Sequence, residues 1–185
     1  NVAEKIDACS VCIYEFRNEE FTGAGFSGNY PLVHSRDPLI FSKRQHLLES
    51  LRKETIIPGM GFPGNILITK QPEFIPDASA DPRFNGYTQG APLGSVLAIP
   101  MLRDGMVNGI VCAVGNKARP GHPFSEQQFD RLKRLTMEIL MVQDLVQVYS
   151  EISRRDRIDQ ELQFARHIQT SLLPASFPQW GDFSI

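Results

Sequence analysis

The sequence predicts an α+β fold in which a central, mostly antiparallel β-sheet is flanked by helices and followed by one long helix. Two apolar runs, residues 95–102 and 107–114, flank an Asp-Gly pair, which is a typical β-hairpin turn. Near the N-terminus, residues 10–16 alternate as a half-buried strand does. Neither proline nor glycine interrupts the chain between residues 125 and 174, so about 48 residues can remain helical.

The remaining elements are expected from similar signals. In chain order they are a helical tail at Val2–Ala8, a hairpin partner strand at Phe21–Phe26, a helix at Leu39–Lys53, a glycine-rich turn at 58–64 with a short buried helix after it, an extended piece at Gln71–Asp77 and a loop at Ala78–Gly94. Pro72 and Pro76 lack an N–H donor, which confines the extended piece to an edge of the sheet.

The long helix has a well-defined predicted start. Ser125 is the expected N-cap, and Gln128 three residues later completes a capping box. Phe124 and Phe129 are placed to form a hydrophobic staple. The face expected to pack on the sheet is formed by Leu132, Leu135, Ile139 and Val142.

Composition is that of an ordinary globular protein, with 42% hydrophobic and 22% charged residues among 185. A net charge of −2 offers no electrostatic footprint for nucleic acid, and no apolar run reaches the roughly 20 residues of a membrane span. Cys9 and Cys12 would point to opposite faces of a strand, so with Cys112 they are interpreted as structural thiols of a reducing compartment. We expect a cytoplasmic protein whose chain, which begins at Asn1, is trimmed at its N-terminus.

Five motifs, in order and at sensible spacing, resemble those of GAF domains. They are the strand SVCIY at 10–14, the turn PGMGFPG at 58–64, the loop IPDASADPRF at 75–84, the hairpin SVLAIPM and NGIV at 95–111, and the NK and PFSEQQ segments between 116 and 128. The resemblance covers about residues 1–150 and implies a GAF (PAS-like) sensor domain.

The resemblance also implies a ligand pocket between the sheet and residues 58–84. Backbone amides of a glycine-rich turn and a helix start can bind an anionic or carbonyl group, and aromatic rings can supply apolar walls. The candidate ligand-binding residues are Phe62, Asn65, Phe74, Asp77, Arg83 and Phe84. A structural alternative stays open, in which Asp77 caps a turn and Arg83 pairs with it to brace the loop.

The cofactor signatures of GAF domains match this sequence only in part. Asn116, Lys117 and Phe124 agree with the signature of cyclic-nucleotide-binding members, but Gln128 and Phe129 stand where that signature has an acidic pair. Bilin attachment would need a Cys-His pair, which does not occur. We therefore expect no cofactor, no metal site and no catalytic residue in these 185 residues.

The end of the chain has a second resemblance. Residues 161–174, ELQFARHIQTSLLP, look like the segment that leads into bacterial PPM-type serine phosphatases of the SpoIIE/RsbU group. In that family Phe183–Ile185 would begin the catalytic domain, which uses Mn²⁺ or Mg²⁺ to activate water against phosphoserine or phosphothreonine, typically on anti-sigma-factor antagonists. The expected domains are a GAF sensor at 1–146, a signalling helix at 147–174 and the truncated start of the phosphatase at 175–185.

The signalling helix carries an apolar stripe with nearly heptad spacing. A charged segment, Arg154–Arg157, interrupts the stripe, and the step from Ile152 to Ile158 shifts its register. Such a stripe predicts a parallel two-chain coiled coil, hence a homodimer, with the charged segment as a hinge. The predicted dimer residues are Leu145, Val148, Ile152, Ile158, Leu162, Ala165, Ile168 and Leu172.

These features together predict a regulatory sensor module that controls a phosphatase through a dimeric signalling helix. Three alternatives stay open, and one of them is a GAF domain that binds a cyclic nucleotide. The domain could bind no ligand and act as a dimerisation scaffold or a docking surface for a protein. It could also be an enzyme that resembles the GAF-like methionine sulfoxide reductases, but these use pocket cysteines and none of the three cysteines lies in residues 58–84.

Overall fold

A computed structural model describes residues 1–17, 19–28, 30, 43–84, 93–116 and 121–172, without the side chains of residues 116 and 169–172. The chain divides into two compact units, Asn1–Leu140 and Met141–Ile185. Within the described ranges, no helix combines the length and the apolar character that crossing a membrane would require.

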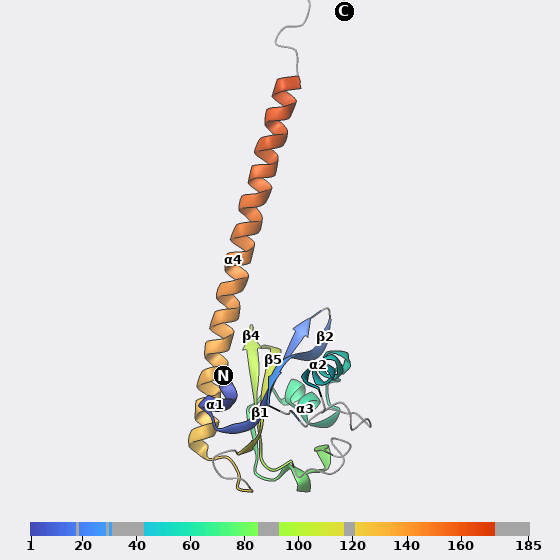
Figure 1. Ribbon diagram of the computed structural model, residues 1–185, viewed down its shortest axis with the longest axis vertical. Coiled ribbons are helices and arrows are strands. Elements are labelled where there is room, and N and C mark those ends of the chain that lie inside the picture. The colour runs from blue at the N-terminus through green and yellow to red at the C-terminus, as the bar shows by residue number, and fades with distance from the viewer. Residues whose placement is uncertain (18, 29, 31–42, 85–92, 117–120, 173–185) are drawn as a thin grey trace, which may run out of the picture. The chain divides into compact units, whose positions relative to one another are not determined.

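One antiparallel sheet of five strands organises the first unit (Figure 1). The strands are β1 (Ala8–Arg17), β2 (Glu20–Ser27), β3 (Glu73–Ile75), β4 (Val96–Arg103) and β5 (Met106–Asn116). Their order across the sheet is β2-β1-β5-β4-β3. The two predicted hairpins therefore lie side by side, and the proline-flanked piece is an edge strand as expected. The predicted α+β fold class is confirmed.

Both faces of the sheet are buried. Side chains alternate along its strands, so successive residues belong to core layers on opposite faces. Val96 of β4 belongs to a first core layer, whereas its neighbour Leu97 belongs to a second core layer on the opposite face. The first layer is covered by α2 (Arg44–Lys53) and α3 (Gly61–Thr69), and the second by α1 (Val2–Lys5) and the start of α4 (Glu126–Leu172), as Figure 1 shows.

The turn in the glycine-rich segment is shorter than the predicted 58–64, because α3 already begins at Gly61. Gly59 turns the chain with a φ of 80°, and its N–H donates to the carbonyl of Gly64 at 2.8 Å. A Cβ added at Gly64 would lie 2.1 Å from the carbonyl oxygen of Ile57, so only glycine fits there. The glycines thus serve close packing of the turn on the helix as well as the turn itself.

Two other boundaries differ from the predictions for local reasons. The N-terminal helix ends at Lys5 and not at Ala8, because Asp7 adopts a left-handed conformation with a φ of 52°. The helix expected at Leu39–Lys53 is observed from Arg44, and its first predicted residues, 39–42, lie outside the described part of the chain.

The predicted capping box at the start of α4 is confirmed. Gln128 accepts a hydrogen bond from the Ser125 backbone N–H at 2.8 Å, and the Gln128 N–H donates to the Ser125 hydroxyl at 3.3 Å. Phe124 and Phe129, the predicted staple pair, both pack into the second core layer. From this start α4 runs for 47 residues, roughly 70 Å at the usual rise.

The second unit is described from Met141 to the end of α4. The helix passes through the charged segment Arg154–Arg157 without interruption. Arg155 pairs with Glu151 at 3.3 Å and Arg157 pairs with Glu161 at 3.1 Å, both at the i,i+4 spacing that supports a helix. The charged segment therefore interrupts the apolar stripe and leaves the helix intact.

Candidate functional site

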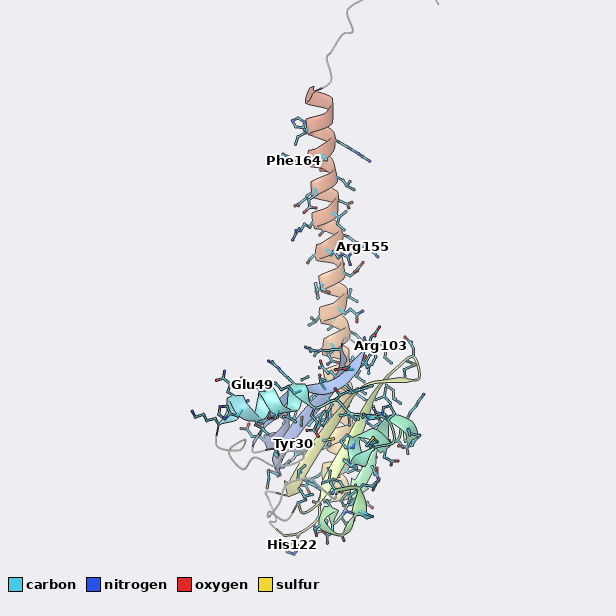
Figure 2. The ribbon with its side chains drawn as sticks, turned by 90° about the vertical axis from the view of Figure 1, so that its right-hand side faces the viewer. Tyr30, Glu49, Arg103, His122, Arg155 and Phe164 are labelled. Carbon is cyan, nitrogen blue, oxygen red and sulfur yellow. The ribbon has the colours of Figure 1, made fainter. Side chains whose placement is uncertain are left out.

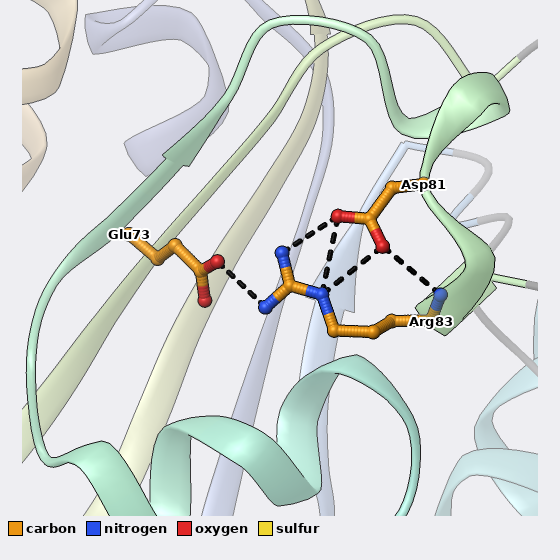
Figure 3. Close-up of polar contacts among 3 residues, drawn as sticks. All are labelled: Glu73, Asp81 and Arg83. Carbon is orange, nitrogen blue, oxygen red and sulfur yellow. Dashed lines mark hydrogen bonds and ion pairs between the residues drawn. The ribbon is translucent and has the colours of Figure 1, made fainter.

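Arg83 is the centre of the polar contacts in the predicted pocket region (Figure 3). Its guanidinium forms ion pairs of 2.6 Å with Asp81 and with Glu73 of β3. The Arg83 Nε also donates to both carboxylate oxygens of Asp81 at 3.1 Å. These hydrogen bonds lower the pKa of Asp81 and raise the pKa of Arg83. The arrangement braces the loop that contains both residues against the edge strand.

Two aromatic rings lie beside this cluster and fill the first core layer. Phe62 of α3 and Phe84 stack with ring centroids 4.8 Å apart, and the Arg83 guanidinium lies 5.6 Å from the Phe62 ring centre. Phe62 is fully buried and Phe84 is 4% exposed. Both rings therefore serve as core residues in this structure, with the cation of Arg83 over one of them.

The structure does not bring the other candidates together with these three residues. Phe74 points into the second core layer, where its ring lies 6.1 Å from that of Phe129, because adjacent residues of β3 face opposite sides. Asn65 is half-buried on α3. Asp77 is exposed and caps the 3₁₀ turn Ala78–Ala80, where its carboxylate accepts from the Ser79 N–H at 3.0 Å.

The structural alternative assigned a turn cap to Asp77 and a pairing with Asp77 to Arg83. The first assignment is confirmed and the second is wrong. Asp77 caps a turn as expected, and its hydrogen bonds with Ser79 lower its pKa. Arg83, however, pairs with Asp81 and Glu73 instead of Asp77. Asp81 immediately precedes the 3₁₀ turn Pro82–Phe84 and also accepts the Arg83 backbone N–H at 2.9 Å, which places its carboxylate beside the guanidinium.

Sequence reasoning missed a cluster of hydroxyl and thiol groups in the first core layer. It consists of Cys12 and Tyr14 of β1, Cys112 of β5, and Tyr30, which is labelled in Figure 2. The two tyrosine hydroxyls lie 3.4 Å apart, and their rings meet edge to face. Burial raises the pKa of all four groups, that of Cys112 to about 12, so each holds its proton at neutral pH.

A partial signal for this cluster was visible in the sequence. Alternation at residues 10–14 predicts that Cys12 and Tyr14 share one face, but strand pairing with Cys112 depends on contacts distant in sequence. Ser10 lies two residues before Cys12 and is also buried, and its hydroxyl has no hydrogen-bond partner among the residues that the structure describes. In the described ranges, no group of three His, Cys, Asp or Glu side chains converges to hold a metal ion.

The predicted dimer residues lie in α4 with their apolar side chains exposed. Leu145, Val148, Ile152, Ile158, Leu162 and Ile168 are each at least 40% exposed, and Ala165 is exposed as well. The side chain of Leu172 lies outside the described residues. Exposed apolar side chains also occur off this stripe, at Val146, Tyr149 and Phe164, the last of which is labelled in Figure 2. Val142, expected to pack on the sheet, is wrongly assigned, because its side chain is 58% exposed.

Comparison with known proteins agrees with this geometry. The family model of the GAF domain matches residues 2–142. The GAF domain of a phosphoenolpyruvate-protein phosphotransferase from Coxiella burnetii is similar with a TM-score of 0.58 at 15% identity, covering 80% of this chain and 79% of that one. The corresponding domain from Acinetobacter has a TM-score of 0.56 at 17% identity, with coverage of 76% and 74%.

A GAF domain from another class of signalling protein is also similar. That of a two-component sensor histidine kinase from Bacillus halodurans has a TM-score of 0.53 at 18% identity, covering 81% of this chain and 93% of that one. At such identities the likeness concerns the fold. No curated protein sequence matches the chain.

Proposed function

This chain belongs to the GAF domain family, whose members are regulatory sensor modules of signalling proteins, and on that premise we propose that it is the sensor part of a bacterial signal-transduction protein with a PPM-type phosphatase output. The protein would act in the cytoplasm. The motif ELQFARHIQTSLLP at 161–174 supports the phosphatase, through its resemblance to the segment that precedes such domains. The output domain would bind Mn²⁺ or Mg²⁺ and hydrolyse phosphoserine or phosphothreonine on a partner of the anti-sigma-factor-antagonist type.

The observation that carries the proposal is the helix α4. Its start is attached to the sensor fold at two points: the hydroxyl of Ser95, just before β4, accepts the Phe124 backbone N–H at 3.1 Å, and the Gln128 side chain donates to the Ile6 carbonyl at 2.9 Å. The same helix then continues, unbroken, to Leu172. A conformational change in the sheet could therefore be transmitted along this continuous helix toward its C-terminal end.

A second copy of this chain is the proposed occupant of the apolar stripe. Leu145, Val148 and Ile152 follow the 3,4 spacing of a coiled-coil core, and their side chains are 50–58% exposed. Continued at that spacing, the next two core positions are Arg155 and Asp159. In a parallel pair these opposite charges occupy adjacent layers, where each arginine can reach the partner's aspartate.

The charged positions also suggest how the pair would signal. Ile158 lies one residue before the position of Asp159, and adjacent residues are roughly 100° apart around a helix, so burying Ile158 in its place requires a rotation of that order in both helices. The two arrangements exchange a charged layer for an apolar one, which is the kind of two-state element that a signal can bias. In this proposal the predicted hinge at Arg154–Arg157 acts through rotation of the two paired helices, while each helix stays intact.

A ligand-independent scaffold is the second candidate function, and the predicted pocket favours it. Phe62 and Phe84 are core residues, and Arg83 and Asp77 are engaged in structural hydrogen bonds. In this alternative the sensor domain would hold two copies together or bind a protein, without a small molecule. The buried hydroxyl of Ser10, which has no partner among the described residues, is the observation that instead favours a polar ligand.

Thermal unfolding with a panel of nucleotides, cyclic nucleotides, amino acids and 2-oxoacids separates the two candidates, with light scattering alongside for the molecular mass. A ligand at 100 times its Kd adds about 2.7 kcal/mol, a shift of a few degrees for a protein of this size. A dimer with such a shift supports the ligand sensor. A dimer without one supports the scaffold, and a monomer contradicts the coiled-coil mechanism.

The phosphatase is tested on the natural protein in which this chain occurs. A PPM-type domain after residue 185, with manganese-dependent release of phosphate from a phosphoserine peptide, supports the proposed output. A different domain at that position overturns it and leaves the sensor assignment in place.

A further inference from the structure

Cys12 and Cys112 lie directly opposite each other in the sheet. The register of β1 against β5 aligns Val11 with Ala113 and Cys12 with Cys112. Opposed residues of antiparallel strands share a face, with Cα atoms roughly 4.5–5.5 Å apart. That spacing falls within the roughly 4.4–6.8 Å that disulfide bridges span.

The surroundings isolate these two thiols from any other sulfur. Both are free thiols with no exposed surface, whereas Cys9 is exposed. Tyr14 and Tyr30 belong to the same core layer as the two thiols, and their hydroxyls lie 3.4 Å apart. Each sulfur therefore has the other as its nearest thiol in a core layer that large molecules cannot enter.

We propose that Cys12 and Cys112 form a cross-strand dithiol that a small peroxide oxidant converts into an intrachain disulfide. One thiol attacks a peroxide oxygen, breaks the O–O bond and becomes a sulfenic acid with release of water. The second thiol then attacks the sulfenic sulfur, forms the S–S bond and releases a second water. Two thiols are oxidised, one hydrogen peroxide is reduced, and the four hydrogen atoms leave as two waters.

Burial determines both the speed and the product of this reaction. The thiolate is the reactive form, and burial keeps both thiols protonated at neutral pH, so oxidation is slow compared with that of an exposed cysteine. Burial also excludes bulky thiols such as glutathione, which disfavours mixed disulfides. The opposed geometry holds the second thiol in place, so the sulfenic acid is captured before further oxidation.

The disulfide would change the polar cluster around it and not only join two strands. Oxidation removes both thiol hydrogens and pulls the sulfurs together, so the tyrosine hydroxyls must rearrange their hydrogen bonds. Tyr30 follows β2, and its fully buried ring packs in the same core layer as the two thiols. The inference rests on strand register and burial, and it is independent of the proposed phosphatase output.

The test uses the whole chain carrying Cys9→Ser, which removes the exposed thiol and leaves the dithiol. The reduced protein is treated with hydrogen peroxide, unfolded in an alkylating agent and analysed by mass spectrometry with peptide mapping before and after reduction. We expect two alkylated thiols before treatment and none after it, a loss of two hydrogen atoms, and a reducible cross-link between the peptides that contain Cys12 and Cys112.

Matched variants complete the test. Cys9→Ser combined with Cys112→Ser should give no cross-link, and Cys9→Ser combined with Cys12→Ala provides a second control from the other strand. Thiols that stay alkylatable in the Cys9→Ser protein after exposure to excess hydrogen peroxide for far longer than full oxidation of Cys9 takes in the unmodified chain would overturn the proposal. Sulfinic acid at either position, or a cross-link between two chains, would overturn it equally.

Discussion

The side-chain amide of Gln128 donates a hydrogen bond to the backbone carbonyl of Ile6 at 2.9 Å, which joins the start of α4 to the end of α1. The other end of the same amide accepts the Ser125 N–H of the capping box. Gln128 therefore caps the N-terminus of α4 and also fastens this end of the helix to a segment from the start of the domain. An acidic residue here would keep the cap and lose the donor to Ile6.

Replacing Gln128 with alanine should lower the free energy of unfolding by about 1–2 kcal/mol, because a helix cap and a partly buried hydrogen bond are lost together. Chemical denaturation with a constant m-value measures this change. The matched control is Gln127→Ala, an exposed position one residue earlier, for which we expect a change within about 0.5 kcal/mol. Equal effects at both positions would show that only helix propensity is involved.

Replacing Arg83 with methionine should cost about 1–2 kcal/mol at neutral pH, because Asp81 and Glu73 lose their shared cation. Arg83 holds the pKa of Asp81 below its usual range, so this stabilisation is present above about pH 4 and is lost as the pH falls through the lowered pKa. The stability difference between wild type and variant should therefore narrow in acid. Denaturation at a series of pH values measures it.

Arg52→Met is the control for that experiment, since Arg52 is an exposed cation on α2. It should change stability little at any pH. A gap between wild type and Arg83→Met that stays constant down to pH 2–3 would mean that packing of the arginine side chain, and not its charge, supports the loop.

Phe62→Ala should destabilise the first unit by about 3–5 kcal/mol, because it leaves a cavity under the stacked ring of Phe84. Phe164→Ala removes the same ring from a position that is 67% exposed and should change unfolding much less. Thermal unfolding of the two variants measures the difference. A small effect of Phe62→Ala, combined with ligand binding in the space it vacates, would show that this ring occupies a pocket.

Val148→Asp should weaken self-association at least tenfold, because the carboxylate would be buried at a core position of the paired helices. Val146→Asp introduces the same charge two residues away, at a side chain that is 63% exposed and off the stripe. Sedimentation or light scattering across a concentration series compares them. Similar weakening by both variants would contradict the assigned stripe.

Much of the fold follows from local patterns in this sequence. Alternation and the Asp-Gly turn predict both hairpins, and the flanking prolines predict an edge strand, because these signals act over a few residues. The start of α4 is predicted for the same reason. Local signals fail where the backbone takes an unusual conformation, as at Asp7, where a left-handed residue ends α1 three residues early.

The candidate site was harder to predict because its contacts are not local. Phe74 and Ile75 look alike as apolar neighbours in the sequence, yet they belong to opposite core layers. The partner of Arg83 was assigned to the wrong aspartate, since two acidic residues lie within six positions of it. The pairing of Cys12 with Cys112 requires β1 to lie between β2 and β5, which no local pattern reveals.

The strand β3 has a mechanical consequence that its three residues would not suggest. Phe74 contacts the layer of α4, while Glu73 on the other side holds the guanidinium of Arg83. These two residues are consecutive, so one peptide unit is clamped from both faces of the sheet. Among the described strands β3 pairs with β4 alone, so this clamped peptide unit links the loop around Arg83 to Phe129 in the first turns of the long helix.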